Sequence, residues 1–169
     1  MVEVPEVGAF LLGAPKCGTT WLAEILTQHP EICVSDPKEP NIVASHKGTF
    51  GRDDSEPDWV EYADCFNGDG LRIDCSVHAM ACPVAPSRVA NNWPNARLII
   101  CLREPVSRTI SHWNMILDTE EDRENGADWS DFRSAWEDSR LSDDTLYGAA
   151  ITRWLEHFER DSILLIEAN

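Results

Sequence analysis

Residues 13–22 read GAPKCGTTWL, and this stretch indicates the fold class of the whole chain. It follows an apolar run, residues 7–12, whose length is typical of a buried strand, and it leads into residues 21–29, whose pattern predicts a helix. The order is therefore strand, glycine loop, helix. Backbone N–H groups at the start of such a helix are unpaired, and the helix dipole adds positive potential there. The stretch predicts a binding site for a phosphate-like anion.

The loop differs from that of a nucleotide kinase or ATPase in the position of its lysine. Loops of that class follow the pattern G-x-x-x-x-G-K-[ST], with Lys directly after the second Gly. Here Gly13 and Gly18 keep the spacing, but Thr19 takes the place of the Lys, and Lys16 lies inside the loop. The pattern favours a P-loop relative that binds phosphate without the usual magnesium–triphosphate arrangement. An ordinary strand-to-helix turn with an exposed lysine is the alternative.

The composition limits the number of domains and the kinds of partner. A chain of 169 residues with 43% hydrophobic content suits a single domain with its own core. Fourteen basic residues against 30 acidic ones give a formal charge of −16, which disfavours nucleic acid and anionic membrane surfaces as partners. We find neither a signal-peptide pattern nor an apolar run of the ~20 residues that a membrane span needs, so we expect a cytoplasmic protein. No feature of the sequence predicts an oligomeric state.

The cysteines do not form a metal-binding or disulfide pattern. None of the six belongs to a C-x-x-C pair, and all lie in or beside expected strands and loops. We therefore expect reduced, mostly buried thiols and neither a zinc site nor a disulfide framework. The residues are Cys17, Cys33, Cys65, Cys75, Cys82 and Cys101.

A second short element, residues 36–40, reads DPKEP. The two prolines restrict the backbone on both sides of Lys38 and Glu39, so both side chains should keep to a narrow range of orientations. A turn of this kind can present a carboxylate that acts as a base. An incidental ion pair on a solvated loop is the alternative.

A third element begins with residues 97–102, a continuous apolar run that predicts a strand covered on both faces. Pro105 suits the first turn of a following helix, which places Arg103 at the carboxyl end of the strand and Ser111 about two turns along the helix. Ligands of parallel α/β sheets bind at that end of the strands. The guanidinium fork of Arg103 and the hydroxyl of Ser111 are suited to bind one phosphate. In the alternative interpretation, Arg103 and Arg108 pair with surface acids.

The rest of the chain predicts alternating strands and helices. We expect a polar loop over residues 45–56, and we interpret the acidic residues 118–144 as a solvated surface. Asp74 and Ser76, at the end of one expected strand, are secondary site candidates. Further strands are expected at residues 32–34, 71–76 and 162–166, and helices at 57–66, 86–92, 132–136 and 146–160.

The three elements resemble sulfotransferases of the heparan-type and bacterial groups that use 3′-phosphoadenosine-5′-phosphosulfate (PAPS). Residues 16–22 are similar to the 5′-phosphosulfate loop of that family, residues 38–40 to its Lys-Glu-Pro element, and residues 102–111 to its Leu-Arg-x-Pro-x-x-Arg-x-x-Ser pattern. The resemblance spans nearly the whole chain. It implies a three-layer α/β domain of the P-loop type with a central parallel sheet flanked by helices.

The resemblance also implies roles for individual residues. Glu39 would be the general base toward the acceptor, Lys38 would lie beside the sulfuryl group, and Lys16 would neutralise charge on the bridging oxygen. Arg103 and Ser111 would bind the 3′-phosphate of the cofactor. The loop residues that would bind the cofactor are Pro15, Lys16, Cys17, Gly18, Thr19, Thr20 and Trp21.

Two departures from the family leave part of the interpretation open. The family often has aromatic residues after the Lys-Glu-Pro element, whereas residues 41–43 here read NIV, so the acceptor is specified only as a carbohydrate or small molecule. Relatives continue well beyond the equivalent of Asn169, so we expect the C-terminal part of the family domain to be missing. The alternatives are a P-loop kinase, which needs a Lys after Gly18, and a non-catalytic nucleotide-binding fragment.

Overall fold

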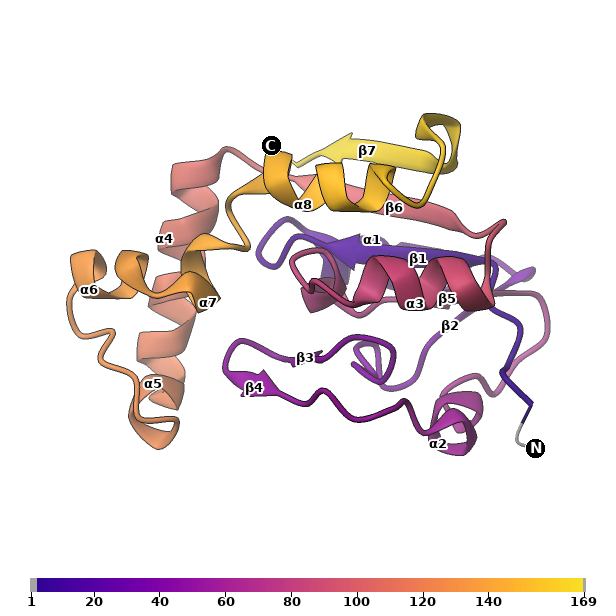
Figure 1. The fold of residues 1–169 in the computed structure, drawn as a ribbon, viewed down its shortest axis with the longest axis horizontal. Coiled ribbons are helices and arrows are strands. Elements are labelled where there is room, and N and C mark those ends of the chain that lie inside the picture. The colour runs from indigo at the N-terminus through magenta and orange to yellow at the C-terminus, as the bar shows by residue number, and fades with distance from the viewer. Residues whose placement is uncertain (1–2, 169) are drawn as a thin grey trace.

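The computed structural model describes residues 3–168, and Figure 1 shows their arrangement. A central sheet contains five parallel strands in the order β2-β5-β1-β6-β7. The middle strand, β1, is buried along its whole length, which explains its continuous apolar run. The strands are β1 (Ala9–Gly13), β2 (Ile32–Val34), β5 (Leu71–Asp74), β6 (Arg97–Leu102) and β7 (Ile163–Glu167).

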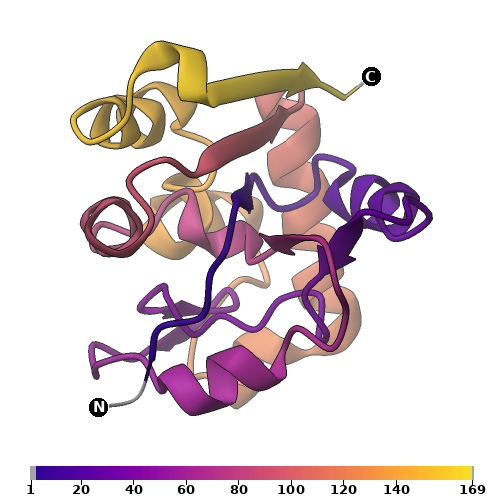
Figure 2. The same cartoon turned by 90° about the vertical axis from the view of Figure 1, so that its right-hand side faces the viewer.

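Helices cover both faces of the sheet and give the three layers that the sequence predicts. Figures 1 and 2 show α3 (Ala85–Asn92) and α8 (Tyr147–Leu155) on one face and α1 (Thr19–Leu26) on the other. Trp154 of α8 is fully buried, and its indole Nε1 donates a hydrogen bond to the carbonyl oxygen of Met80 at 3.2 Å. The main core therefore joins α8 to the segment that follows β5.

A separate group of helices lies at the carboxyl ends of the strands. Helix α4 (Pro105–Thr119) crosses this end of the sheet in Figure 1. Ile116 of α4 packs in a small second core with Trp129, Ala135 and Leu141. The neighbouring helices are α5 (Glu121–Glu124), α6 (Phe132–Glu137) and α7 (Ser139–Ser142). None of the helices in residues 3–168 has the length and apolar character needed to cross a membrane.

Smaller elements complete the structure. The hairpin of β3 (His46–Lys47) and β4 (Gly51–Arg52) is antiparallel and lies outside the main sheet. Helix α2 (Trp59–Asp64) begins at Asp58, whose carboxylate accepts hydrogen bonds from two backbone N–H groups of its first turn. The 3₁₀ turns are η1 (Val77–Ala79) and η2 (Arg160–Ser162).

The structure differs from the sequence-based expectations at several places. The hairpin β3–β4 lies within the expected polar loop. Helix α8 ends at Leu155 instead of residue 160, because the chain turns there to enter β7 while Phe158 stays buried and continues the apolar stripe. Asp122 and Asp144 are each only 5% exposed, so the acidic stretch is not a purely solvated surface. All six cysteines are buried free thiols, as expected.

Candidate functional site

The glycine loop connects β1 to α1 at the carboxyl end of the sheet. Gly18 takes a left-handed conformation with φ 78° at the start of α1, where glycine is least strained. No side chain within residues 3–168 caps this helix end, and its first turn contains no acidic residue. The amides at Thr19 and Thr20 therefore stand at a helix end whose dipole favours an anion.

Contacts of the buried Cys17 side chain stabilise this conformation of the loop. Cys17 is 1% exposed, and its Sγ lies 3.7 Å from the carbonyl oxygen of Pro15 and 3.7 Å from the Tyr147 hydroxyl. Burial raises the pKa of the Cys17 thiol, so this group stays protonated at neutral pH. The Tyr147 hydroxyl also donates to the carbonyl oxygen of Arg103 at 3.1 Å. Tyr147 thus ties the loop to the segment between β6 and α4.

Lys16, Arg103 and Ser111 come together around one open pocket of about 650 Å³ between the loop and α4, which we call the cofactor pocket. The Arg103 guanidinium donates to the carbonyl oxygen of Lys16 at 3.5 Å, and the Lys16 ammonium lies 3.5 Å from the Met115 sulfur. The residues that line the pocket are Lys16, Arg103, Ser107, Ile110, Ser111, Asn114, Met115, Asp118 and Thr119.

Three polar residues of α4 that line the cofactor pocket were not predicted from the sequence. Ser107, Asn114 and Asp118 line the pocket beside Ser111. Their spacing of three or four residues from one another is that of a single helix face, which was the signal available in the sequence. Lys16 is the one residue of the expected loop set that lines the pocket within residues 3–168. Trp21, on α1, is 66% exposed. The loop residues outside the lining are Pro15, Cys17, Gly18, Thr19, Thr20 and Trp21.

Lys38 and Glu39 form a half-buried ion pair outside the lining of the cofactor pocket. The Lys38 ammonium donates to Glu39 Oε1 at 2.7 Å, and the two side chains are 23% and 31% exposed. The hydroxyl of Ser35 donates to the Lys38 carbonyl oxygen at 2.8 Å, and the Asn41 amide nitrogen Nδ2 donates to the Glu39 carbonyl oxygen at 3.1 Å. Hydrogen bonds thus hold the backbone on both sides of the Glu39 carboxylate.

The secondary candidates Asp74 and Ser76 form an internal support for this turn. Asp74 is 2% exposed and accepts hydrogen bonds from the Tyr62 hydroxyl at 2.7 Å and from the Ser76 backbone N–H at 2.8 Å. Burial raises the pKa of its carboxyl group. The Ser76 hydroxyl in turn accepts from the Asn41 backbone N–H at 3.0 Å. The contacts connect the end of β5 to the residue that follows the Lys-Glu-Pro element.

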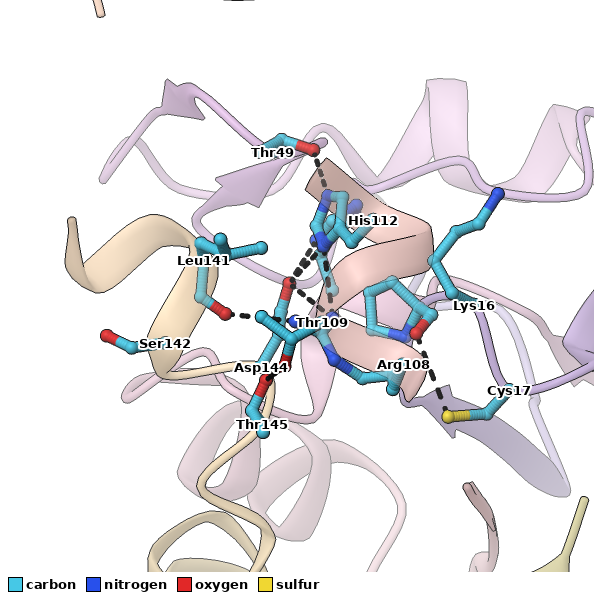
Figure 3. A network of polar contacts seen from close by, with 12 residues as sticks. Lys16, Cys17, Thr49, Arg108, Thr109, His112, Leu141, Ser142, Asp144 and Thr145 are labelled. Atoms are coloured by element: carbon cyan, nitrogen blue, oxygen red, sulfur yellow. Dashed lines mark hydrogen bonds and ion pairs between the residues drawn. The ribbon is translucent and has the colours of Figure 1, made fainter. Parts of the chain in front are cut away.

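A buried polar network includes the buried side chains of α4 (Figure 3). Arg108 and His112 are both fully buried and share a hydrogen bond of 3.0 Å. Arg108 also donates to the Leu141 carbonyl oxygen at 3.1 Å, and His112 Nε2 lies 2.9 Å from the Thr49 hydroxyl. These contacts fix α4 against both α7 and the β3–β4 hairpin.

Asp144 is the carboxylate of this network. Its Oδ2 lies 3.9 Å from the Arg108 guanidinium and 3.7 Å from Nδ1 of both His78 and His112. Burial raises the pKa of Asp144 to about 7, against the opposing effect of the Arg108 charge. Burial also lowers the pKa of His78 to about 3 and that of His112 to about 2. The two imidazoles are therefore neutral at physiological pH.

Comparisons with known proteins identify the family. A family model described as "Sulfotransferase domain" matches residues 8–167. The chain is 25% identical over 175 residues to mouse (Mus musculus) heparan sulfate glucosamine 3-O-sulfotransferase 3A1, with 97% of this chain and 41% of the relative covered. It therefore spans less than half of that relative's length.

Solved structures agree in fold. A sulfotransferase from Alicyclobacillus acidocaldarius superposes with a TM-score of 0.79 at 26% identity, covering 97% of this chain and 74% of the other. The sulfotransferase domain from the curacin biosynthetic pathway has a TM-score of 0.64 at 14% identity, with 98% and 68% covered, and shows the fold alone. With the family model extending over almost the entire chain, the chain belongs to the sulfotransferase family.

Proposed function

We propose that the chain transfers a sulfuryl group from PAPS to a hydroxyl or amine of a carbohydrate or small-molecule acceptor. The observation that carries the proposal is the convergence of Lys16, Arg103 and Ser111 on one pocket beside the start of α1. A volume of about 650 Å³ lies within the range of small-molecule sites. The six buried free thiols suit a reducing compartment, so the proposal includes a cytoplasmic location.

The proposal assigns the two ends of PAPS to two groups of side chains. The unpaired amides at Thr19 and Thr20 would bind the 5′-phosphosulfate, because no acidic side chain in the first turn of α1 opposes an anion there. Pro15, Cys17 and Gly18 would hold the loop around it, and Trp21 would offer its exposed indole to the cofactor. Arg103 and Ser111 would bind the 3′-phosphate through a guanidinium fork and a hydroxyl.

The reaction would be an in-line displacement at sulfur. The acceptor oxygen or nitrogen forms a bond to sulfur while the bond from sulfur to the bridging oxygen breaks, and adenosine 3′,5′-bisphosphate leaves. Lys16 would neutralise the charge that develops on the bridging oxygen. Glu39 would take the acceptor proton, and Lys38, 2.7 Å from Glu39, would lie beside the sulfuryl group. Hydrogen bonds through Ser35 and Asn41 support the orientation of this pair.

The transfer of radiolabelled sulfuryl from PAPS to a panel of acceptors tests the proposal. The panel should contain heparan-type oligosaccharides, free amino sugars and simple phenols. We expect label transfer to at least one of them and its loss in Lys16→Ala, with only a modest loss of nucleotide binding. Arg97→Ala is the matched control, because it removes a cation at the opposite end of β6 from Arg103. Label transfer that survives in Lys16→Ala would rule out the proposed role.

A further inference from the structure

A second pocket, of about 290 Å³, lies between the β3–β4 hairpin and α8. Its walls come from segments that are distant in the sequence, and it shares no lining residue with the cofactor pocket. We call it the hairpin pocket. The residues that line it are His46, Arg52, Ala81, Pro83, Ser139, Asp143, Leu146, Ala149 and Arg153.

Basic groups outnumber acidic ones in the hairpin pocket, although the chain as a whole carries a charge of −16. Two guanidinium groups, of Arg52 and Arg153, and the imidazole of His46 line it, against the single carboxylate of Asp143. Within residues 3–168, neither Arg52 nor Arg153 forms an ion pair. The pocket thus holds positive charge that no carboxylate of the described chain neutralises by direct contact.

Backbone carbonyls orient both guanidinium groups. Arg52 Nη1 donates to the carbonyl oxygens of Thr49 at 3.1 Å and Gly51 at 2.7 Å. Arg153 Nη2 donates to the carbonyl oxygen of Ala81 at 2.8 Å. Each guanidinium has five N–H donors, so both keep donors to spare. Because their positions are already fixed by these contacts, an incoming anion would lose little binding energy to ordering the side chains.

One of the spare donors has no partner in the described part of the chain. Arg153 Nε is buried and has no hydrogen-bond acceptor. A buried donor that stays unpaired is costly. Burial, together with the positive charges of Arg52 and Arg153, lowers the pKa of His46 to about 4. His46 is therefore neutral at pH 7 and can still donate one ring N–H.

We propose that the hairpin pocket is a second oxyanion site, in which Arg52 and Arg153 bind a sulfate-like group. A volume of about 290 Å³ exceeds the size of a bare oxyanion, so the group can belong to a larger molecule. The same contacts would accept a free inorganic anion. The site lies apart from the sulfuryl-transfer chemistry proposed above and does not depend on it.

Equilibrium dialysis with radiolabelled inorganic sulfate tests the site in the full chain, with the cofactor pocket saturated by adenosine 3′,5′-bisphosphate. We expect saturable binding of one sulfate, weakened at least about tenfold in Arg153→Gln and in Arg52→Gln, because each loses a charge-assisted hydrogen bond. Arg153→Lys keeps the charge but loses the guanidinium fork and should fall between wild type and Arg153→Gln. Arg97→Gln, which lines neither pocket, should bind like wild type.

Competition with glucose 6-sulfate separates the two sources of the anion. Stronger binding than inorganic sulfate, with the same dependence on Arg153, would show that the group belongs to a larger molecule, whereas equal binding would indicate a free ion. An absence of saturable sulfate binding, or binding that Arg153→Gln and Arg153→Lys leave unchanged, would overturn the site. If the bisphosphate itself does not bind, the proposed function fails. The Arg52 and Arg153 variants still test the hairpin pocket in that case, because neither residue lines the cofactor pocket.

Discussion

Replacing Asp144 with Asn should change the pH dependence of stability, because this carboxyl takes up a proton within the range in which the protein works. Burial raises its pKa from 3.8 to about 7. The folded state therefore holds the proton more tightly than the unfolded state. Asp144 contributes stability that is fully present below about pH 4 and is lost as the pH rises through about 7.

The neighbouring imidazoles change the stability with pH in the opposite direction to Asp144. Burial lowers the pKa of His78 to about 3 and that of His112 to about 2, from 6.5 in the unfolded chain. The unfolded chain binds these protons first, so stability is lost as the pH falls below about 6.5. When the pH falls from 7 to 5, the two imidazoles together lower the free energy of unfolding by about 4 kcal/mol. Protonation of Asp144 in the folded state offsets about 2 kcal/mol of this loss.

Asn at position 144 has the shape of the protonated acid but cannot take up a proton. On acidification from pH 7 to pH 5, the variant should therefore lose about 2 kcal/mol more than wild type, which corresponds to roughly 4–8 °C in Tm for a chain of this size. Other titrating groups, including His46, contribute about equally to both proteins and cancel in the comparison.

The assay is thermal unfolding followed by circular dichroism at pH 7 and pH 5 and constant ionic strength. Asp143→Asn is the matched control, because it removes a neighbouring carboxylate that is exposed. Its pH dependence should follow that of wild type. Equal losses of Tm in wild type and Asp144→Asn would refute the reasoning, since Asp144 would then stay ionised beside Arg108 throughout this range.

Three further substitutions probe the loop, the base and the core. Gly13→Ala should destabilise the fold by about 2 kcal/mol or more, visible as a lower urea midpoint, because φ is +134° and the new Cβ would meet the Val77 carbonyl oxygen. Glu39→Gln should lower the sulfuryl-transfer rate by about 10²- to 10⁴-fold while calorimetric nucleotide binding is retained, and an unchanged rate would remove Glu39 as the base. Trp154→Ala should lower the free energy of unfolding in urea by about 3–5 kcal/mol, because the side chain is fully buried and donates to the Met80 carbonyl oxygen. A loss below about 1 kcal/mol would contradict the packing.

The elements that could be predicted from the sequence are those with strong local signals. Strands β2 and β6 have the predicted bounds, because continuous apolar runs next to proline or charged residues specify them locally. The glycine loop was predictable because the two glycines and the helix that follows are contiguous. Lys16, Arg103 and Ser111 line one pocket, because the carboxyl ends of parallel strands share one edge of the sheet.

The features that could not be predicted depend on partners that are distant in the sequence. Asp144 lies among acids, and its burial depends on Arg108 and His112, more than 30 residues earlier in the chain. The β3–β4 hairpin has strands of two residues each, too short for the alternation that marks a strand. The hairpin pocket needs Arg52 and Arg153 in one lining, and the sequence shows only two isolated arginines.

Calorimetric titration with adenosine 3′,5′-bisphosphate, alongside ATP plus magnesium on the same preparation, tests the central claim most directly. The account predicts tight binding of the bisphosphate, weak binding of ATP, and loss of bisphosphate binding in Arg103→Ala but not in Arg97→Ala. A preference for magnesium-ATP would contradict the account and favour a kinase. Binding of neither nucleotide would mean that the cofactor pocket, despite its Lys16, Arg103 and Ser111, does not hold PAPS in this chain.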